Sequence, residues 1–322
     1  MTRVNWGVLG CSGFARSVAL PALSAARGAR IHAIASRDLE RARETADLFR
    51  ARRAYGAYED LLADAAVDAV YIPLPNSLHA HWAVRAIDAG KHVLCEKPLA
   101  ATRGEAARVA DAAARRGVQA MEAFMWRFHP QHDFAVQRIR EGAIGVVRLV
   151  RAAFTFVIAR EPNIRLNSAL GGGSLLDVGC YPVSAARLYF GAEPVRAYAR
   201  SRIDAEYGVD MATAGVLEFE QGEALIDCGF DLPYRADLEI CGERGVIQVP
   251  AAWLPPEQAH IVVNGETQAF GVCNQYVQEF EHFSRCVRNE EPPRFGIEDA
   301  VQQARVIEAV RRSAEMLAPV NV

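Results

Sequence analysis

A lysine at the end of a short apolar run is the side chain of this sequence best suited to exchange a proton with a substrate hydroxyl. Residues 90–98 read GKHVLCEKP, so Lys97 closes an apolar strand that a proline stops. Open α/β sheets bind their ligands at the carboxyl ends of such strands. An ammonium there can exchange a proton with a carbinol oxygen. Taken alone, Lys97 is better explained as a solvated lysine in a turn, because most lysines are exposed.

A glycine-rich segment adds an acid and a phenol. Residues 171–182 read GGGSLLDVGCYP, which puts Asp177 and Tyr181 four positions apart. On a helix they share one face and can point into the same cleft. With a lysine they would form a proton-transfer set. The residues alone leave an alternative open, in which Asp177 neutralises a structural arginine and Tyr181 packs in the core.

The first apolar run leads into a glycine turn and then a helical stretch, which is the context that a dinucleotide fingerprint requires. Ser12 stands where the second glycine of that fingerprint is expected, so the match is imperfect. N–H groups at the helix start still favour an anion, and a serine hydroxyl can donate to a phosphate oxygen. A tight turn that binds no nucleotide is the alternative. The candidate phosphate-loop residues are Gly10, Ser12, Gly13, Phe14 and Ala15.

The end of the second apolar run bears on the choice of cofactor. Ser36 and Arg37 follow it, and Arg41 lies one helical turn later. An acidic residue at this point usually binds the ribose of NAD, whereas serine and arginine suit the 2′-phosphate of NADP. Asp38 can be the N-cap of the next helix, and both arginines can be surface charges. The pattern favours NADP, with NAD possible.

A proline-rich loop follows the third apolar run of this region. Residues 73–79 read PLPNSLH, and the prolines fix a loop that would lie over the nicotinamide end of a cofactor. Asn76 or Ser77 is the candidate N-cap of the helix that follows. For His79 alone, solvation in the first turn of a helix is the simpler explanation.

Two patterns of hydrophobic residues indicate the elements that must position these groups. Up to residue 121, short apolar runs alternate with amphipathic stretches, which is typical of a doubly wound parallel sheet. Beyond residue 124, β-branched and aromatic runs bounded by Gly and Pro indicate a mostly antiparallel sheet. The predicted strands are 5–9, 31–35, 69–72, 92–95, 118–121, 146–157, 195–200, 214–219, 224–230, 236–240, 246–249 and 260–263; the helices are 15–26, 39–49, 78–89, 102–116, 175–190, 276–287 and 297–316.

The predicted fold is therefore an α/β Rossmann domain followed by an α+β domain with a large, open, mostly antiparallel sheet. We expect the boundary near residue 123, with a dinucleotide-binding domain at 1–123 and a second domain at 124–322. The chain has 322 residues and a formal net charge of −3, so no global field points to nucleic acid or an anionic membrane. Small molecules and copies of the chain itself remain as partners.

The cysteines and the termini indicate a cytoplasmic protein. Seven cysteines are an odd and widely spaced set, with neither a C-x-x-C pair nor zinc-site spacing, so we expect no metal site. Reduced thiols inside apolar runs fit a reducing compartment. No signal-peptide pattern opens the chain, and no apolar run approaches the span of a bilayer.

Five motifs in order give the chain a resemblance to the Gfo/Idh/MocA oxidoreductases over essentially its whole length. They are AGKHV running into EKP at 89–98, the loop 73–79, EAFMWRFHP at 122–130, the segment 171–181, and NQY at 274–276. The resemblance is strongest to the sugar dehydrogenases, sugar ketoreductases and dimeric dihydrodiol dehydrogenases. It implies a substrate-binding second domain that often forms the dimer, and hence a homodimer or a dimer of dimers.

The resemblance also implies roles for individual residues. Lys97 would protonate or deprotonate the reacting oxygen, with Glu96 shaping the loop beside it. Tyr181 would be the second acid/base group, and tyrosine instead of histidine favours the branch named above. Asp177 would orient substrate hydroxyls or tune Lys97. The implied cofactor groove consists of Gly10, Ser12, Phe14, Ala15, Ser36, Arg37, Arg41, Pro73, Leu74, Asn76, His79, Glu96 and Lys97, with Trp126 and Arg127 at the nicotinamide end.

The implied reaction is hydride transfer between nicotinamide C4 and a carbinol or carbonyl carbon of a sugar, ketosugar or related polyol. One alternative is an NAD-dependent glycosidase that oxidises its sugar transiently. Another is a sensor that binds NADP without turnover. Loops 158–170 and 231–235 are the candidates for substrate choice. Arg160, Arg165 and Tyr234 there can contact hydroxyls or a phosphate, or can equally be ordinary surface residues.

Overall fold

A computed structural model describes residues 3–160 and 163–322 and divides the chain into two compact units. The first consists of Met1–Met125 and Asn274–Val301, and the second of Trp126–Cys273 and Gln302–Val322. Residues 274–301 follow the boundary expected from the sequence, yet they pack with the first unit. The first unit is therefore built from two separate stretches of chain.

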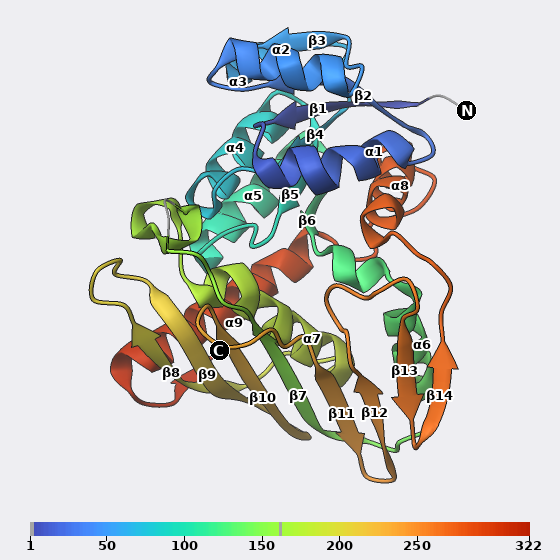
Figure 1. The fold of residues 1–322 in the computed structure, drawn as a ribbon, viewed down its shortest axis with the longest axis vertical. Helices are drawn as coiled ribbons and strands as arrows, with labels where there is room; N and C mark the ends of the chain where they lie inside the picture. Colours follow the sequence, from blue (N-terminus) through green and yellow to red (C-terminus); the bar gives the residue numbers. More distant parts are fainter. Residues whose placement is uncertain (1–2, 161–162) are drawn as a thin grey trace. The chain divides into compact units, whose positions relative to one another are not determined.

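The first unit holds a parallel sheet of six strands in the order β3-β2-β1-β4-β5-β6 (Figure 1). This order is that of the doubly wound dinucleotide-binding fold. A row of aligned residues, Ile34, Val8, Tyr71 and Leu94, crosses four strands and is buried. The strands are β1 (Val4–Leu9), β2 (Ala29–Ala35), β3 (Arg53–Tyr55), β4 (Ala69–Ile72), β5 (His92–Glu96) and β6 (Ala120–Ala123). The predicted Rossmann sheet is confirmed.

The helices of this unit begin and end at the expected kinds of residue. Asp38 caps α2 by accepting from two backbone N–H groups, and Thr102 caps α5, which ends at the left-handed Gly117. The strand β3 and helix α3 were not predicted, because they span only three and five residues. The helical elements are a π-helical turn (Ala15–Ala19), α1 (Leu20–Ala25), α2 (Leu39–Leu48), α3 (Tyr58–Leu62), α4 (Asn76–Asp88), α5 (Arg103–Arg116) and α8 (Gln275–Val287).

The second unit holds a sheet of nine strands in the order β14-β13-β12-β11-β7-β10-β9-β8-β15. Neighbouring strands pair antiparallel except β7 and β10, which are parallel. The mostly antiparallel sheet predicted for this region is therefore confirmed. Its strands are β7 (Val147–Thr155), β8 (Arg196–Ile203), β9 (Asp210–Phe219), β10 (Gly222–Gly229), β11 (Leu238–Gly242), β12 (Gly245–Val249), β13 (His260–Val263), β14 (Glu266–Ala269) and β15 (Val320–Asn321).

The two faces of this sheet differ in composition, because aligned residues of neighbouring strands share a face. One aligned row is wholly buried and consists of Ala197, Leu217, Ala224, Val150, Ile240 and Ile247. The next row is exposed or half-buried and consists of Tyr198, Val216, Leu225, Arg151, Glu239 and Gln248. The first face is the one that the helices cover.

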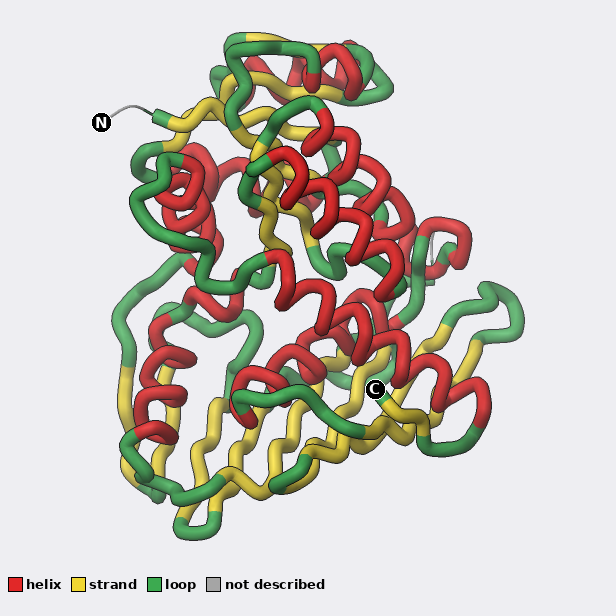
Figure 2. The backbone as a smooth tube through the Cα atoms, turned by 180° about the vertical axis from the view of Figure 1, so that it is seen from behind, coloured by secondary structure: helices red, strands yellow, loops and turns green. Residues whose placement is uncertain are grey.

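Figure 2 shows helices of the second unit in front of its strands. Helix α7 (Cys180–Phe190) continues a π-helical turn at Leu175–Gly179. Helix α6 (Pro130–Arg140) begins at a proline, which is favoured at a first helical position. Helix α9 (Ile297–Met316) ends against β8, where Ser313 Oγ accepts from Ala199 N at 3.0 Å. Short 3-10 turns lie at Met125–Phe128, Ile164–Leu166 and Ser168–Leu170. None of the helices in the described part of the chain is long and apolar enough to cross a membrane.

Candidate active site

The turn after β1 has the shape that a phosphate-binding loop needs. Gly10 has a φ of 110°, and a Cβ there would lie 2.9 Å from Leu74 Cδ2, so only glycine fits this turn. Ser12 Oγ accepts from Ala15 N at 3.1 Å, which caps the helix and leaves the hydroxyl proton available to donate. A Cβ at Gly13 would meet nothing within 4 Å, so the loop is open on that side. Free N–H groups of a helix start beside open space fit an anionic phosphate.

The end of β2 resolves the role of Asp38. Its carboxylate accepts from Glu40 N at 3.0 Å and from Arg41 N at 3.2 Å, as an N-cap does. Ser36 is buried and its Oγ accepts from Asp38 N at 3.2 Å. Arg37 and Arg41 are exposed. The strand tip therefore presents two arginines while its carboxylate is used by the backbone.

A further arginine that sequence reasoning missed lies near the same loop. Burial raises the pKa of the Cys11 thiol, while the positive charges of Arg41 and Arg16 act in the opposite direction. Both guanidinium groups therefore direct positive potential at the turn after β1. Arg16 sits in the helix that follows the loop, where its position in the sequence gives no signal of this role.

His79 connects the two loops at the carboxyl ends of β4 and β5. One ring nitrogen lies 2.7 Å from Pro98 O and the other 2.7 Å from Leu74 O. Burial lowers the pKa of His79, and the positive charge of Lys97 acts in the same direction. Through these two contacts His79 holds the loops on either side of Lys97 in place. Asn76, at the start of the same helix, is half-buried.

Lys97 is half-buried at the end of β5, beside a hydrogen-bonded carboxylate. Glu96 accepts from Tyr71 Oη at 2.6 Å and from the Lys97 backbone N at 3.3 Å. The sequence has one other lysine, Lys91, which is buried and donates to Asp64 O and Val67 O at 2.7 and 2.8 Å. Lys97 is therefore the one lysine at the carboxyl edge of the sheet.

Tyr181 lies on α7 among aromatic rings of the second unit. Its ring centroid is 5.1 Å from that of Phe154, edge to face, and 5.7 Å from that of Trp253. Trp253 is fixed in turn, because its Nε1 donates to Ala153 O at 2.8 Å. The phenol is 5 % exposed, so packing restricts the directions in which it can point.

Asp177 lies one turn before Tyr181 and has an arginine partner. Arg165 Nε donates to Asp177 Oδ2 at 2.6 Å. The sequence left an arginine partner for Asp177 open, and the structure identifies it in the loop 158–170. Sequence reasoning missed Asp210, which accepts from Ser174 Oγ and Leu175 N at 2.6 and 2.7 Å. Asp210 thereby anchors the π-helical turn that carries Asp177.

Trp126 and Arg127 are buried within the second unit. Arg127 donates to Ser184 Oγ through Nε at 2.9 Å and through Nη2 at 2.6 Å. The Trp126 ring contacts those of His132 at 4.6 Å and Trp253 at 5.2 Å. Both residues therefore support the segment that carries Tyr181, and their predicted contact with the nicotinamide stays a prediction.

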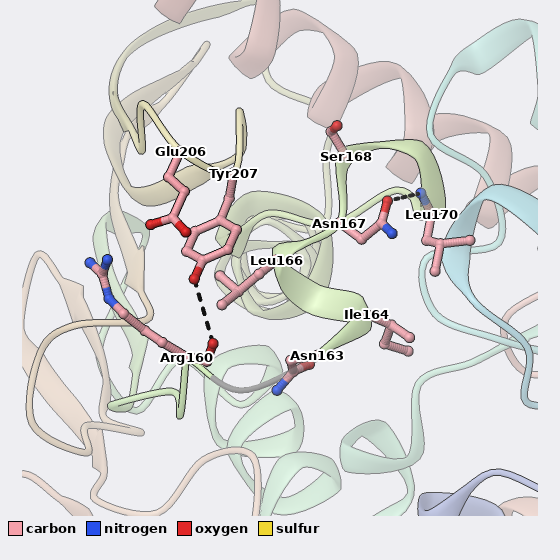
Figure 3. Close-up of a pocket in the computed structure, with 9 residues that line it drawn as sticks. All are labelled: Arg160, Asn163, Ile164, Leu166, Asn167, Ser168, Leu170, Glu206 and Tyr207. Carbon is pink, nitrogen blue, oxygen red and sulfur yellow. Dashed lines mark hydrogen bonds between the residues drawn. The ribbon is translucent and has the colours of Figure 1, made fainter.

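A hollow of about 660 Å³ lies beside the loop 158–170 of the second unit (Figure 3). Arg160 pairs with Asp204 at 3.4 Å, and Tyr207 Oη donates to Arg160 O at 3.5 Å. Its wall mixes amides, a carboxylate and apolar groups, which suits a hydroxylated ligand. The lining residues are Arg160, Asn163, Ile164, Leu166, Asn167, Ser168, Leu170, Glu206 and Tyr207.

In the described residues of the first unit, one group of side chains has the types and spacing of metal ligands. It consists of His282, Cys286 and Glu291, at the end of α8. His282 Nδ1 lies 2.7 Å from Glu291 Oε1, and His282 Nε2 accepts from Arg294 N at 3.0 Å. Arg285 Nε also donates to Glu291 Oε1, at 2.7 Å. Hydrogen bonds thus occupy both ring nitrogens, and the group acts as a brace between α8 and the turn after it.

Lys97 belongs to the first unit, and Asp177 and Tyr181 belong to the second. The phosphate loop, the arginines after β2, the loop 73–79 and Lys97 all follow strands of one parallel sheet at their carboxyl ends. Together these residues could bind a dinucleotide, and Lys97 would place its ammonium group at the same edge of the sheet.

Comparison with known proteins agrees with these geometries. Residues 4–124 match the family model described as "Oxidoreductase family, NAD-binding Rossmann fold", and residues 132–248 match the GFO/IDH/MocA C-terminal domain. The chain is 41% identical to a D-xylose 1-dehydrogenase (NADP(+)) of Haloferax volcanii, over 98% of this chain and 99% of that protein.

Two further relatives come from Actinomadura kijaniata. A dTDP-3,4-didehydro-2,6-dideoxy-alpha-D-glucose 3-reductase is 37% identical over 97% of this chain and 96% of that protein. The crystal structure of a 3-ketoreductase in complex with NADP and TDP-benzene superposes with a TM-score of 0.91 at 35% identity, covering 97% of this chain and 98% of that one. The chain therefore belongs to the Gfo/Idh/MocA oxidoreductase family and is an NAD(P)-dependent dehydrogenase or reductase.

Proposed function

We propose that this enzyme interconverts a carbinol and a carbonyl group of a sugar, ketosugar or related polyol with NADP, and that Lys97 and Tyr181 handle the proton. The observation that carries the proposal is the half-buried Lys97 at the carboxyl edge of the parallel sheet, in a chain whose only other lysine is buried elsewhere. A bound nicotinamide cofactor would supply or accept the hydride.

The proton chemistry follows from the charge of Lys97. An ordinary lysine, with a reference pKa of about 10.4, is charged at neutral pH and is a good acid. In reduction it would donate to the oxygen that becomes the hydroxyl. In oxidation a base is needed, and Tyr181 would share that task. Asp177 would orient substrate hydroxyls, with its own carboxylate held by Arg165.

NADP is supported by the end of β2. Asp38 caps the helix through Oδ1, which accounts for this acidic residue without a ribose ligand. The exposed Arg37 and Arg41 suit a 2′-phosphate, and Ser36 adds a hydroxyl. The relatives' names point the same way, since one is an NADP(+)-dependent dehydrogenase and another was crystallised with NADP.

A sugar substrate is supported by the relatives and by the second unit. D-xylose and a dTDP-linked keto sugar appear in the names of two relatives. In this chain the hollow beside the loop 158–170 offers two amides and one carboxylate that can bind hydroxyls. We assign substrate selection to this loop, and substrate binding to the second unit as a whole.

We also propose that the second unit forms a homodimer through the open face of its sheet. Tyr198 and Leu225 expose 41 and 40 % of their surface there, beside ion pairs such as Arg196–Glu218 at 2.7 Å. A second copy would cover these apolar groups. Light scattering should give a dimer mass for the wild type and a monomer for Leu225→Glu; a monomeric wild type would contradict the proposal.

The direct test of the activity is a screen of NADP and NAD with aldoses, ketosugars, cyclitols and trans-dihydrodiols, followed by absorbance of the reduced cofactor. We expect turnover with at least one sugar and a preference for NADP. Release of an aglycone without net change in cofactor would favour the glycosidase instead. Tight NADP binding with no turnover on any compound would favour a sensor.

A further inference from the structure

A buried carboxyl group on α8 has no part in the reaction described so far. Glu279 is 1 % exposed, and within residues 3–160 and 163–322 its Oε1 has no hydrogen-bond partner. An isolated buried carboxylate is costly in free energy, whereas a neutral carboxylic acid is far less so. The state of this group therefore depends on the residues around it.

Helix α8 packs against the parallel sheet of the first unit through the residue next to Glu279. The next residue, Phe280, packs against Tyr71 of β4 at 5.1 Å and against Trp6 of β1 at 5.4 Å. At the start of the helix, the Tyr276 ring lies 6.0 Å from that of Phe14 in the phosphate loop. Glu279 therefore lies one helical turn after Tyr276, whose ring contacts Phe14 of the phosphate loop.

The titratable groups that act on Glu279 belong to the Lys97 site. Burial raises the pKa of Glu279 well above its ordinary value, and the negative charge of Glu96 raises it further. Burial also raises the pKa of Tyr71 well above its ordinary value, and the hydrogen-bonded carboxylate of Glu96 raises it further. The neighbour from β1, Trp6, carries no charge.

The two carboxyl groups differ in the donors they receive. Glu96 accepts from Tyr71 Oη at 2.6 Å and from Lys97 N at 3.3 Å, and it lies at the half-buried edge. In the described part of the chain, Glu279 Oε1 receives no such bond. When one of two buried carboxyl groups has hydrogen-bond donors and the other lacks them, the second is the one that keeps its proton.

We propose that Glu279 keeps its proton in the folded enzyme, and that it is a positioning residue which adds no further negative charge to the surroundings of Glu96 and Lys97. A second carboxylate would stabilise the ammonium of Lys97 further and make it a weaker acid. The inference rests on the proposed role of Lys97, but neither of its tests needs a substrate.

The first test locates the proton by infrared spectroscopy at pH 7. The wild type should show the C=O stretching band of a buried protonated carboxyl group, and this band should vanish in Glu279→Gln. The same band should persist in Glu96→Gln, which is the matched control. A band lost in Glu96→Gln but kept in Glu279→Gln, or no such band in the wild type, would overturn the proposal.

The second test reads Lys97 directly. Because the sequence has two lysines, protein labelled with ε-13C lysine gives separate NMR signals for Lys97 and the buried Lys91, and the Lys91 signal reports that each variant is folded. Removing a neighbouring charge should lower the Lys97 pKa by about one unit in Glu96→Gln, against less than about 0.3 in Glu279→Gln. Equal lowering in both variants would mean that Glu279 is charged, which contradicts the proposal. Either result stands whether or not a substrate has been found.

Discussion

The segment around Lys97 in the first unit and the segment around Tyr181 in the second hold their candidate proton-transfer groups by different means. Around Lys97 the neighbours are polar: Glu96 bonds to Tyr71, and His79 bridges Pro98 and Leu74. Around Tyr181 they are aromatic rings, Phe154 and Trp253.

The difference shows which property each segment controls. A carboxylate and hydrogen bonds beside an amine set its charge and the path of its backbone. Aromatic packing cannot donate or accept a proton, so it sets where the phenol points and excludes water from it. We infer that electrostatics tunes the lysine and that packing orients the tyrosine. Substitutions in the two segments should therefore reduce activity in different ways.

The largest effect is expected for Lys97→Met. Losing the general acid should lower kcat by about a thousandfold, within the usual contribution of such groups. Titration of NADP against tryptophan fluorescence should give an affinity close to that of the wild type, because the phosphate loop and Arg41 are untouched. Unchanged turnover would remove Lys97 from the reaction, while lost NADP binding would make it a cofactor ligand only.

Tyr181→Phe should lower kcat by about a hundredfold, because the charged lysine can still act in its absence. The ring stays, so the aromatic contacts and the melting temperature should be retained. Tyr189→Phe on the same helix is the matched control, since that buried hydroxyl contacts His132 at 2.7 Å. The control should lose about 1 kcal/mol of stability and little activity. The opposite pattern would indicate that Tyr181 is a structural residue.

Arg165→Ala should raise the KM for the substrate by about tenfold and leave kcat within a factor of a few, because Asp177 loses the donor that orients it. Arg138→Ala, which breaks the exposed pair with Glu141 at 2.6 Å, should change neither constant. Steady-state kinetics with the best substrate of the screen provides the measurement. Equal constants for Arg165→Ala and the wild type would refute an orienting role.

The smallest expected effect is on the stability of the folded protein in acid. It tests whether His132, beside the aromatic cluster around Tyr181, is uncharged in the folded state. Burial lowers the pKa of His132, behind the aromatic cluster, to about 3. Below about pH 6.5 His132 binds a proton in the unfolded chain but not in the folded one. The contribution of His132 to the free energy of unfolding is therefore complete above that pH and falls as the pH drops toward 3.

Between pH 7.5 and 5.5 this single group should cost about 1.4 kcal/mol of unfolding free energy in the wild type. His132→Gln should lack that part of the loss. Urea unfolding at the two pH values measures the difference. Parallel losses in the two proteins would mean that His132 is charged in the folded state.

Much of this fold could be predicted because buried positions recur with the period of a helix or a strand. Strands β1, β4 and β13 and helix α9 lie within a residue of their predicted bounds, because their apolar residues follow one period. Helix α6 was missed, since its start at Pro130 follows an aromatic segment with no clear period. The exposed edge strand β14 has no buried residue to mark it.

Where one residue type is required, the candidate positions follow from local context: Gly10 has a positive φ, and Lys97 follows the end of β5. Where partners come from distant segments, the sequence gives less information. The pairing of Arg165 with Asp177 depends on the course of a loop. The burial of Glu279 is hidden because a charged residue on an amphipathic helix is normally exposed.

The most direct test of the central claim is a double-mutant cycle of Lys97→Met and Tyr181→Phe, measured as kcat/KM with the best substrate and NADP. Groups that serve the same proton are not additive, so the double variant should be about as slow as Lys97→Met alone. If the two losses multiply, Lys97 and Tyr181 act independently, and the proposal that they share one proton-transfer step is contradicted.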